Sequence, residues 1–223
     1  MSLSVAMFRR IVIAAVIAGV LAGITLTVLQ ASAVVPLILE VETFERAQGA
    51  GHQPAPDWAP EDGTQRTLYT ALANSGTGIG FALLLGALFA LREPVSVPQG
   101  MLWGGVGYLV FYLNPGLGLP PELPGTPSAP LLERQIWWLS AVLTTAGGIA
   151  LLVTTRQWFY KLAVLALLAL PHLAGAPHAG HGASSVPEDL AGRFVFAATW
   201  TNGAFWLLLG TVLAWLFERL GRV

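Results

Sequence analysis

Three of the four histidines of this chain lie in one short segment, and together they could bind a metal ion. The run 171–181 contains His172, His178 and His181, separated by glycine, alanine and proline. Neutral imidazole is a common protein ligand for cobalt, nickel and zinc-like ions. His178 and His181 could meet across one turn, and the intervening glycine and proline could fold the loop back towards His172. The alternative is a loop of small residues that contains histidines by chance, because this spacing matches no standard metal motif.

Carboxylates gather in a second segment. Glu40, Glu42 and Glu45 lie within six residues, and Glu42 and Glu45 would share a face if a helix continues that far. Clustered carboxylates attract divalent cations and raise their local concentration. A solvated helix end is the simpler explanation of the same acids. The chain has no cysteine, so any metal would need nitrogen and oxygen ligands.

The elements that must position these groups are apolar. Of the 223 residues 55% are hydrophobic and 10% charged, and the mean hydropathy is +0.67. We therefore predict an all-α polytopic transmembrane helical bundle that forms a single integral membrane domain, since about 20 apolar residues cross a bilayer core. The expected spans are about 10–39, 67–91, 97–113, 135–155, 157–173 and 194–217, and the expected external loops are 40–66, 114–134 and 174–193.

Arg9 and Arg10 precede the first span, so the positive-inside rule predicts a cytoplasmic N-terminus. The fifth span is the least secure, because its apolar core 162–170 is short and ends at Pro171. Five spans with a re-entrant segment are the alternative to six.

With six spans, all four histidines and ten of the twelve acidic residues lie outside. Acidic residues contribute little to orientation, so this asymmetry needs another cause. The ten acids are Glu40, Glu42, Glu45, Asp57, Glu61, Asp62, Glu122, Glu133, Glu188 and Asp189.

Few polar residues fall inside the predicted spans. Gln30, Asn74 and Asn202 could line a path for a partly dehydrated ion, although hydrogen bonding between helices is the more usual role. Glycine pairs four residues apart predict close helix contacts, at Gly19 and Gly23, Gly76 and Gly80, and Gly100 and Gly104.

A run rich in glycine and proline, 114–125, predicts a stiff non-helical external lid. Arg134 follows the lid and is expected to pair with one of its acids. Trp137 and Trp138 open the fourth span, where we interpret them as an interfacial belt.

Several of these motifs occur in an order that resembles the CbtA family, probable cobalt transporter subunits associated with cobalamin biosynthesis. They are Arg9-Arg10, the segment 35–40, the run 118–125 that contains Glu122, the segment 134–138, the run 171–178, and Val186-Pro187. The resemblance implies residence in a bacterial inner membrane, uptake of Co²⁺ and a small single-span partner, CbtB, with its own histidines.

The leading hypothesis is therefore a subunit for uptake of cobalt or nickel ions, without enzymatic activity, a permanently bound cofactor or a nucleic-acid partner. His172 and His178, with Glu40 and Glu122, lie in the family-like runs and are expected to capture the ion, and His181 lies just beyond them. A non-transport accessory or assembly subunit of a membrane complex is the alternative. An outer-face metalloenzyme is a third hypothesis, since a three-histidine site could activate water.

Overall fold

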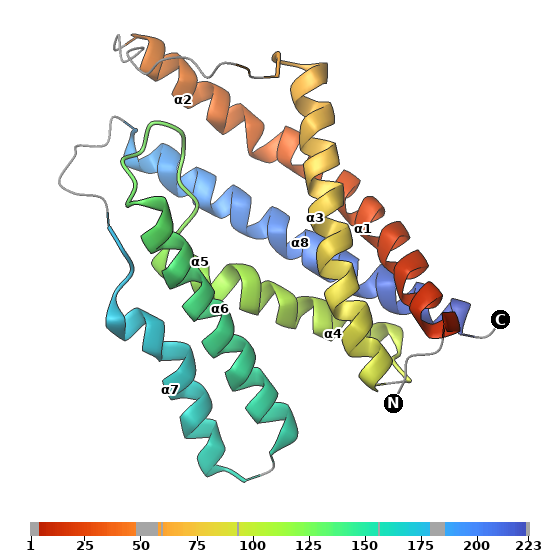
Figure 1. Ribbon diagram of the computed structural model, residues 1–223. Helices are drawn as coiled ribbons and strands as arrows, with labels where there is room; N and C mark the ends of the chain where they lie inside the picture. Colours follow the sequence, from red (N-terminus) through yellow and green to blue (C-terminus); the bar gives the residue numbers. More distant parts are fainter. Residues whose placement is uncertain are drawn as a thin grey trace. The chain divides into compact units, whose positions relative to one another are not determined.

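All regular elements in the described part of the chain are helices (Figure 1). The structure is a computed structural model that describes residues 5–47, 58, 60–92, 94–155, 157–178 and 186–221. The helices are α1 (Val5–Ala33), α2 (Val35–Ala47), α3 (Thr64–Arg92), α4 (Val97–Tyr108), the π-helix η1 (Leu109–Leu113), α5 (Asn114–Gly118), α6 (Leu131–Thr154), α7 (Phe159–Ala174) and α8 (Glu188–Leu220). The predicted all-helical membrane fold is confirmed.

Four of these helices, α1, α3, α6 and α8, are long and apolar enough to cross a membrane. They contain 29, 29, 24 and 33 residues, and a rise of about 1.5 Å per residue makes even α6 roughly 36 Å long. The apolar helix α7 has 16 residues, or about 24 Å, somewhat less than the roughly 30 Å hydrocarbon core. The fifth predicted span is thus a helix, and it is a short one.

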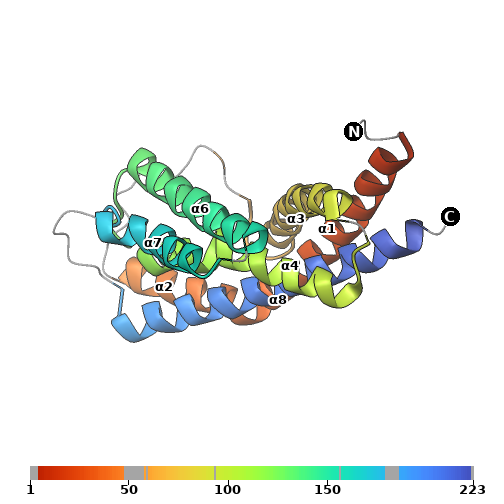
Figure 2. The same cartoon turned by 90° about the horizontal axis from the view of Figure 1, so that it is seen from below.

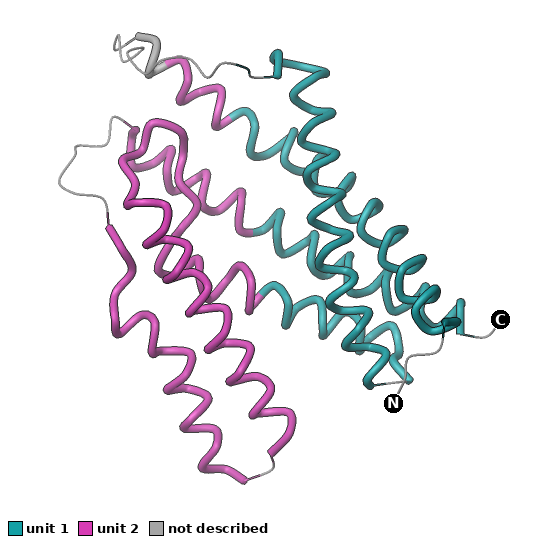
Figure 3. Tube along the Cα trace, in the orientation of Figure 1, with its two compact units in different colours: residues 1–36, 51–108, 200–223 teal, residues 37–50, 109–199 magenta. Residues whose placement is uncertain are grey.

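The chain divides into two compact units (Figure 3), which we describe separately. Unit 1 comprises residues 1–36, 51–108 and 200–223, and unit 2 comprises residues 37–50 and 109–199. Among the described residues, three continuous helical stretches pass from one unit to the other: α2, the run 97–118, formed by α4, η1 and α5, and the helix α8.

In unit 1, α1 and α3 run antiparallel and their backbones touch (Figures 1 and 2). A Cβ atom added at Gly23 would lie 2.5 Å from the backbone of Ser75, and one at Gly19 would overlap the backbone of Ile79. Only glycine allows such an approach. The predicted packing role of Gly19 and Gly23 is therefore confirmed.

The second contact in unit 1 joins α4 to the C-terminal half of α8, again antiparallel. A Cβ atom at Gly100 or Gly104 would overlap the backbone of Gly210 or Trp206 respectively, which confirms the second predicted glycine pair. The third predicted pair behaves differently, because a Cβ atom at Gly76 or Gly80 would meet nothing within 4 Å. These two glycines lie on the side of α3 that faces away from α1.

Arg10, near the start of α1, closes the C-terminal end of α8. Its guanidinium donates hydrogen bonds from Nε and Nη2 to the carbonyl oxygen of Phe217, with an Nε–O distance of 2.8 Å, and lies 4.0 Å from the centre of the Phe217 ring. A cation is favoured there because the last carbonyls of a helix carry partial negative charge. The two helix ends that bear the chain termini therefore lie at the same end of unit 1.

In unit 2, α6 runs antiparallel to both α5 and α7, and α6 lies beside α7 in both views (Figures 1 and 2). The start of α6 meets the end of α5, where a Cβ atom at Gly118 would overlap the ring of Trp137. Further along α6, Gly148 faces Val164 and Leu168 of α7.

Two prolines locally change the predicted helices. Pro36 cannot donate a backbone hydrogen bond, and the expected first span 10–39 contains a turn at Val34 that separates α1 from α2. Pro115 lies inside the continuous run 97–118, directly after the π-helix, whose wider turn accommodates the proline ring. As a result the helix extends to Gly118, so the expected non-helical lid starts at Leu119 instead of Asn114.

The glycine contacts predict a stability difference between two identical substitutions on neighbouring helices. Gly23→Ala should destabilise the protein by about 1–3 kcal/mol, because the added methyl group pushes α1 away from the backbone of α3. Gly76→Ala should be neutral or slightly stabilising, since its methyl group meets open space and alanine favours the helix. Thermal unfolding of the detergent-solubilised variants measures both effects, and equal melting temperatures would contradict the packing described here.

Candidate functional site

Asn114 is the centre of a polar cluster in unit 2, formed by Asn114, Trp137, Thr145 and His172. Asn114 starts α5 and is 5% exposed. Its Nδ2 donates a hydrogen bond to Thr145 Oγ1 on α6 at 2.7 Å, and its Oδ1 lies 3.2 Å from Nε2 of His172 on α7. One amide side chain thus connects three helices. We refer to these four residues as the Asn114 cluster.

Trp137 forms the wall of this cluster. Its indole Nε1–H donates to the carbonyl oxygen of Pro171 at 3.1 Å, and its ring meets the His172 ring edge-on, with centroids 5.5 Å apart. The ring is 7% exposed, because it fills the space left by Gly118. The expectation that Trp137 belongs to an interfacial belt is therefore wrong, whereas its neighbour Trp138 is 38% exposed, as that expectation requires.

The local sequence explains how α7 presents His172. Pro171 and His172 occupy the last turn of α7, which ends at Gly175 with φ +86°, a conformation that glycine adopts without strain. The backbone N–H of Gly175 donates to the carbonyls of both Pro171 and His172. This end of the helix is thereby held in place, and the half-buried imidazole projects from an ordered turn.

The other predicted histidines are placed differently. His178 is exposed in the segment after α7, and its Nδ1 contacts the carbonyl of Ala176, two residues earlier. His181 lies outside the described residues. Within the described part of the chain, no group of three or more His, Cys, Asp or Glu side chains is arranged to hold a metal ion.

Both predicted carboxylates face an arginine. Glu122, in the segment between α5 and α6, lies 3.2 Å from Arg134, and the two side chains are 28% and 30% exposed. This pair confirms that Arg134 binds an acid of the lid. Glu40 on α2 lies 3.8 Å from Arg193 on α8, and both side chains are about half exposed. Pairs this exposed contribute about 1 kcal/mol or less each.

The predicted ion-capture residues that the structure describes, as distinct from the path residues, lie near one end of unit 2. This end carries the C-terminus of α7 with His172, the segment before α6 with Glu122, and the start of α8, where Arg193 binds Glu40. Each of these side chains is held by a different partner. Asn114, which binds His172, was not predicted as a site residue, because the sequence placed it at the start of the glycine- and proline-rich lid.

The polar residues expected along an ion path include one pair that joins helices in unit 1. Asn74 on α3 donates to Gln30 Oε1 at 2.8 Å and to Thr27 Oγ1 at 3.0 Å, both on α1. Hydrogen bonding between helices, the more usual role of such residues, is thus observed here. Asn202 lies in α8.

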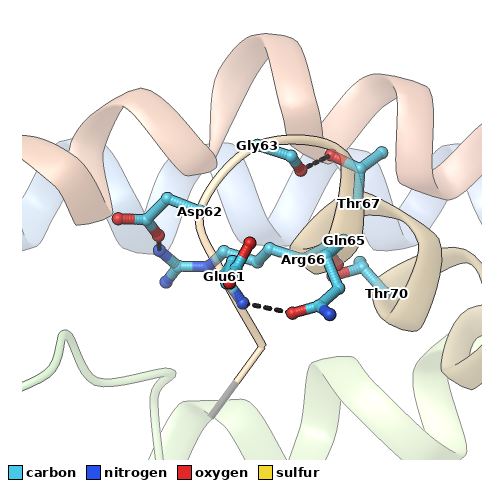
Figure 4. Close-up of polar contacts among 7 residues, drawn as sticks. All are labelled: Glu61, Asp62, Gly63, Gln65, Arg66, Thr67 and Thr70. Atoms are coloured by element: carbon cyan, nitrogen blue, oxygen red, sulfur yellow. Dashed lines mark hydrogen bonds and ion pairs between the residues drawn. The ribbon is translucent and has the colours of Figure 1, made fainter.

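Two other predicted outer acids help to start α3 (Figure 4). Asp62 accepts a hydrogen bond from Arg66 at 3.0 Å, one turn into the helix, and the backbone N–H of Glu61 donates to the side-chain oxygen of Gln65. Gly63, with φ +93°, makes the turn between them. These contacts resemble a helix cap, in which the Asp62 carboxylate and the Glu61 backbone N–H take part.

The Asn114 cluster predicts that the two adjacent tryptophans differ in importance. Trp137→Phe keeps an aromatic side chain but removes the N–H that donates to Pro171, and it should destabilise the protein by about 0.5–1.5 kcal/mol. Trp138→Phe, the matched control, should change stability by less than about 0.5 kcal/mol because the side chain is more exposed. Thermal unfolding in detergent compares the two, and a larger loss at Trp138 would contradict the geometry.

Comparison with known proteins gives one kind of match. A family model described as "Probable cobalt transporter subunit (CbtA)" matches residues 8–218, from the first turn of α1 to the last turn of α8. No curated protein and no solved structure matches the chain.

Proposed function

This chain belongs to the CbtA family of probable cobalt transporter subunits, and we propose that it takes up Co²⁺, or the chemically similar Ni²⁺, from the outer side of a bacterial inner membrane. In this proposal the ion is captured by imidazole and carboxylate groups near the outer end of unit 2. The ion is the transported substrate, and it supplies the only metal chemistry that the proposal requires.

The observation that carries the proposal is the position of His172. A metal-binding histidine usually has one ring nitrogen hydrogen-bonded to a fixed partner, which orients the other nitrogen towards the metal. His172 has this arrangement, because Asn114 binds Nε2 and Trp137 contacts the ring. Neutral imidazole also suits cobalt and nickel better than magnesium or calcium, which prefer oxygen ligands.

The sidedness of the site follows from six membrane crossings, which we propose on the basis of helix directions. Antiparallel contacts relate α1 to α3, α4 to α8, α5 to α6 and α6 to α7, and the run 97–118 is continuous. These relations support the proposal that six segments alternate in direction. If Arg9 and Arg10 keep the N-terminus in the cytoplasm, the end of unit 2 that carries His172 faces outwards.

Capture would involve an exchange of partners by the carboxylates. Glu40 and Glu122 are bound to Arg193 and Arg134, and an arriving divalent cation competes with those guanidinium groups. The exposed His178, with His181, would supply further imidazole nitrogens. Exposed ion pairs are weak enough to open at little cost.

Movement of the ion inwards is favoured by the membrane potential, which for a divalent cation amounts to roughly 4.6 kcal/mol per 100 mV. Gln30, Asn74 and Asn202 are the polar side chains along the spans that we assign to its path. A small single-span CbtB-type subunit would complete the transporter, and cobalamin biosynthesis would consume the cobalt.

Uptake of radiolabelled Co²⁺ into cells tests the role of the histidines. His172→Ala should lower the initial rate at least about tenfold, because even the groups that orient a metal ligand typically contribute 10–100-fold in metal affinity. His178→Ala should lower it less, since this side chain is exposed. His52→Ala, a histidine to which we assign no role, is the control. Undiminished uptake in both His172→Ala and His178→Ala would rule out the histidine mechanism.

The absence of cysteine makes the topology directly testable with single-cysteine variants. Ser128→Cys, before α6, should react with a membrane-impermeant maleimide on intact cells, whereas Gln157→Cys, after α6, should react only after permeabilisation. Both positions are exposed, so burial does not explain a difference. The opposite pattern would invert the orientation, and labelling of both from outside would show that α6 does not cross the membrane.

A further inference from the structure

The hydrogen bonds of the Asn114 cluster have a direction, and it is set by Thr145. The Thr145 hydroxyl has one proton, which it donates to the carbonyl oxygen of Ala141 in its own helix at 2.7 Å. Towards Asn114, 2.7 Å away, the same oxygen can then only accept. The Asn114 group that faces Thr145 must be the donor Nδ2, so the amide has one favoured orientation.

The amide orientation determines the protonation of His172. With Nδ2 directed at Thr145, Oδ1 is the atom 3.2 Å from His172 Nε2. A carbonyl oxygen only accepts, so Nε2 carries the hydrogen, and in the neutral imidazole Nδ1 then keeps its lone pair. The reverse arrangement would require Thr145 to give up its bond to Ala141.

From this chain of bonds we propose that Asn114 is a positioning residue, which holds His172 as the Nε2–H tautomer and makes Nδ1 the metal-binding atom. The inference rests on the proposed function for the metal and on the geometry alone for the tautomer. Trp137 does not compete, because its only N–H is donated to Pro171. The preceding π-helix brings Asn114 to this point, and such turns are frequent at functional sites.

A fixed tautomer matters for metal binding because the two ring nitrogens are not equivalent. A histidine free to exchange its proton presents Nδ1 as a ligand only part of the time. The groups that orient metal-binding histidines typically contribute 10–100-fold in metal affinity. Asn114 should therefore contribute to Co²⁺ affinity without touching the ion.

Nitrogen NMR of metal-free protein with ¹⁵N-labelled histidine rings tests the tautomer directly. The spectrum is recorded above the pH at which imidazole titrates, and the His172 signals are identified by their loss in His172→Gln. The wild type should show Nε2 protonated and Nδ1 unprotonated. A His172 protonated at Nδ1 would overturn the inference.

Four variants test the cause. Asn114→Leu should reduce the preference for the Nε2–H tautomer and weaken Co²⁺ binding, measured by equilibrium dialysis, about 10–100-fold. Asn114→Asp should preserve the preference, because a carboxylate also only accepts. Thr145→Val should let the amide turn over and shift His172 towards Nδ1–H. Thr144→Val, the matched control, loses only bonds within its own helix and should leave tautomer and affinity unchanged.

The outcomes separate this inference from the proposed function. If His172→Gln abolishes Co²⁺ binding but Asn114→Leu changes neither tautomer nor affinity, the positioning role is wrong and the transport function stands. If the tautomer depends on Asn114 but the wild type binds no Co²⁺, the proposed function is wrong, and with it the assignment of Nδ1 as a ligand. If Asn114→Leu does not fold, the tautomers of His172 in Asn114→Asp and Thr145→Val still decide the test. An unchanged tautomer in Thr145→Val would then contradict the positioning role.

Discussion

A buried polar side chain in an apolar helical bundle has to find its hydrogen-bond partners inside the protein, and unit 2 depends on how Asn114 meets this constraint. The amide is almost completely buried and donates to Thr145 of α6 while it accepts from His172 of α7. Transfer of an unpaired amide from water to an apolar medium costs several kcal/mol. Mutations in proteins give a smaller cost, roughly 1–3 kcal/mol, for leaving such a buried group without a partner. The same bonds therefore bring three helices together and orient the imidazole of His172.

Unit 1 is assembled on a different principle. Its helices approach until their backbones touch, through glycines on α1, α3, α4 and α8, and dispersion forces between these close surfaces replace the hydrophobic effect that lipid does not provide. Asn74 adds interhelical hydrogen bonds to α1, and Arg10 covers the end of α8. Among the described residues, none of these contacts involves a histidine. The described contacts of the two units thus differ in chemistry: those of unit 1 hold helices close together, and those of unit 2 also orient His172.

In the proposed function, the charged residues at one end of unit 2 form a binding surface without a preformed metal site. Glu40 and Glu122 are paired with arginines, which avoids leaving carboxylates unpaired near an apolar core. His172 needs no such partner, because a neutral imidazole carries no charge. An ion would therefore first meet a nitrogen ligand that is already oriented, and only then draw carboxylates away from their arginines. In this proposed order of events, the histidine would select the metal and the carboxylates would balance its charge.

The sequence alone determined the class of the fold, because hydropathy and helix length are properties of consecutive residues. It also determined two of three glycine contacts, the pairing of Arg134 with an acid of the lid, and the family. Only the tertiary structure decided which polar residues meet, since a partner can lie 30 or more positions away and depends on how each helix is rotated. For this reason the sequence predicted Asn114 to lie in a loop, Trp137 to lie at the membrane interface, and Gly76 and Gly80 to form a packing face. The identity of His172 as a candidate ligand came from composition, whereas the direction of its ring came from a hydrogen-bonded asparagine 58 positions earlier.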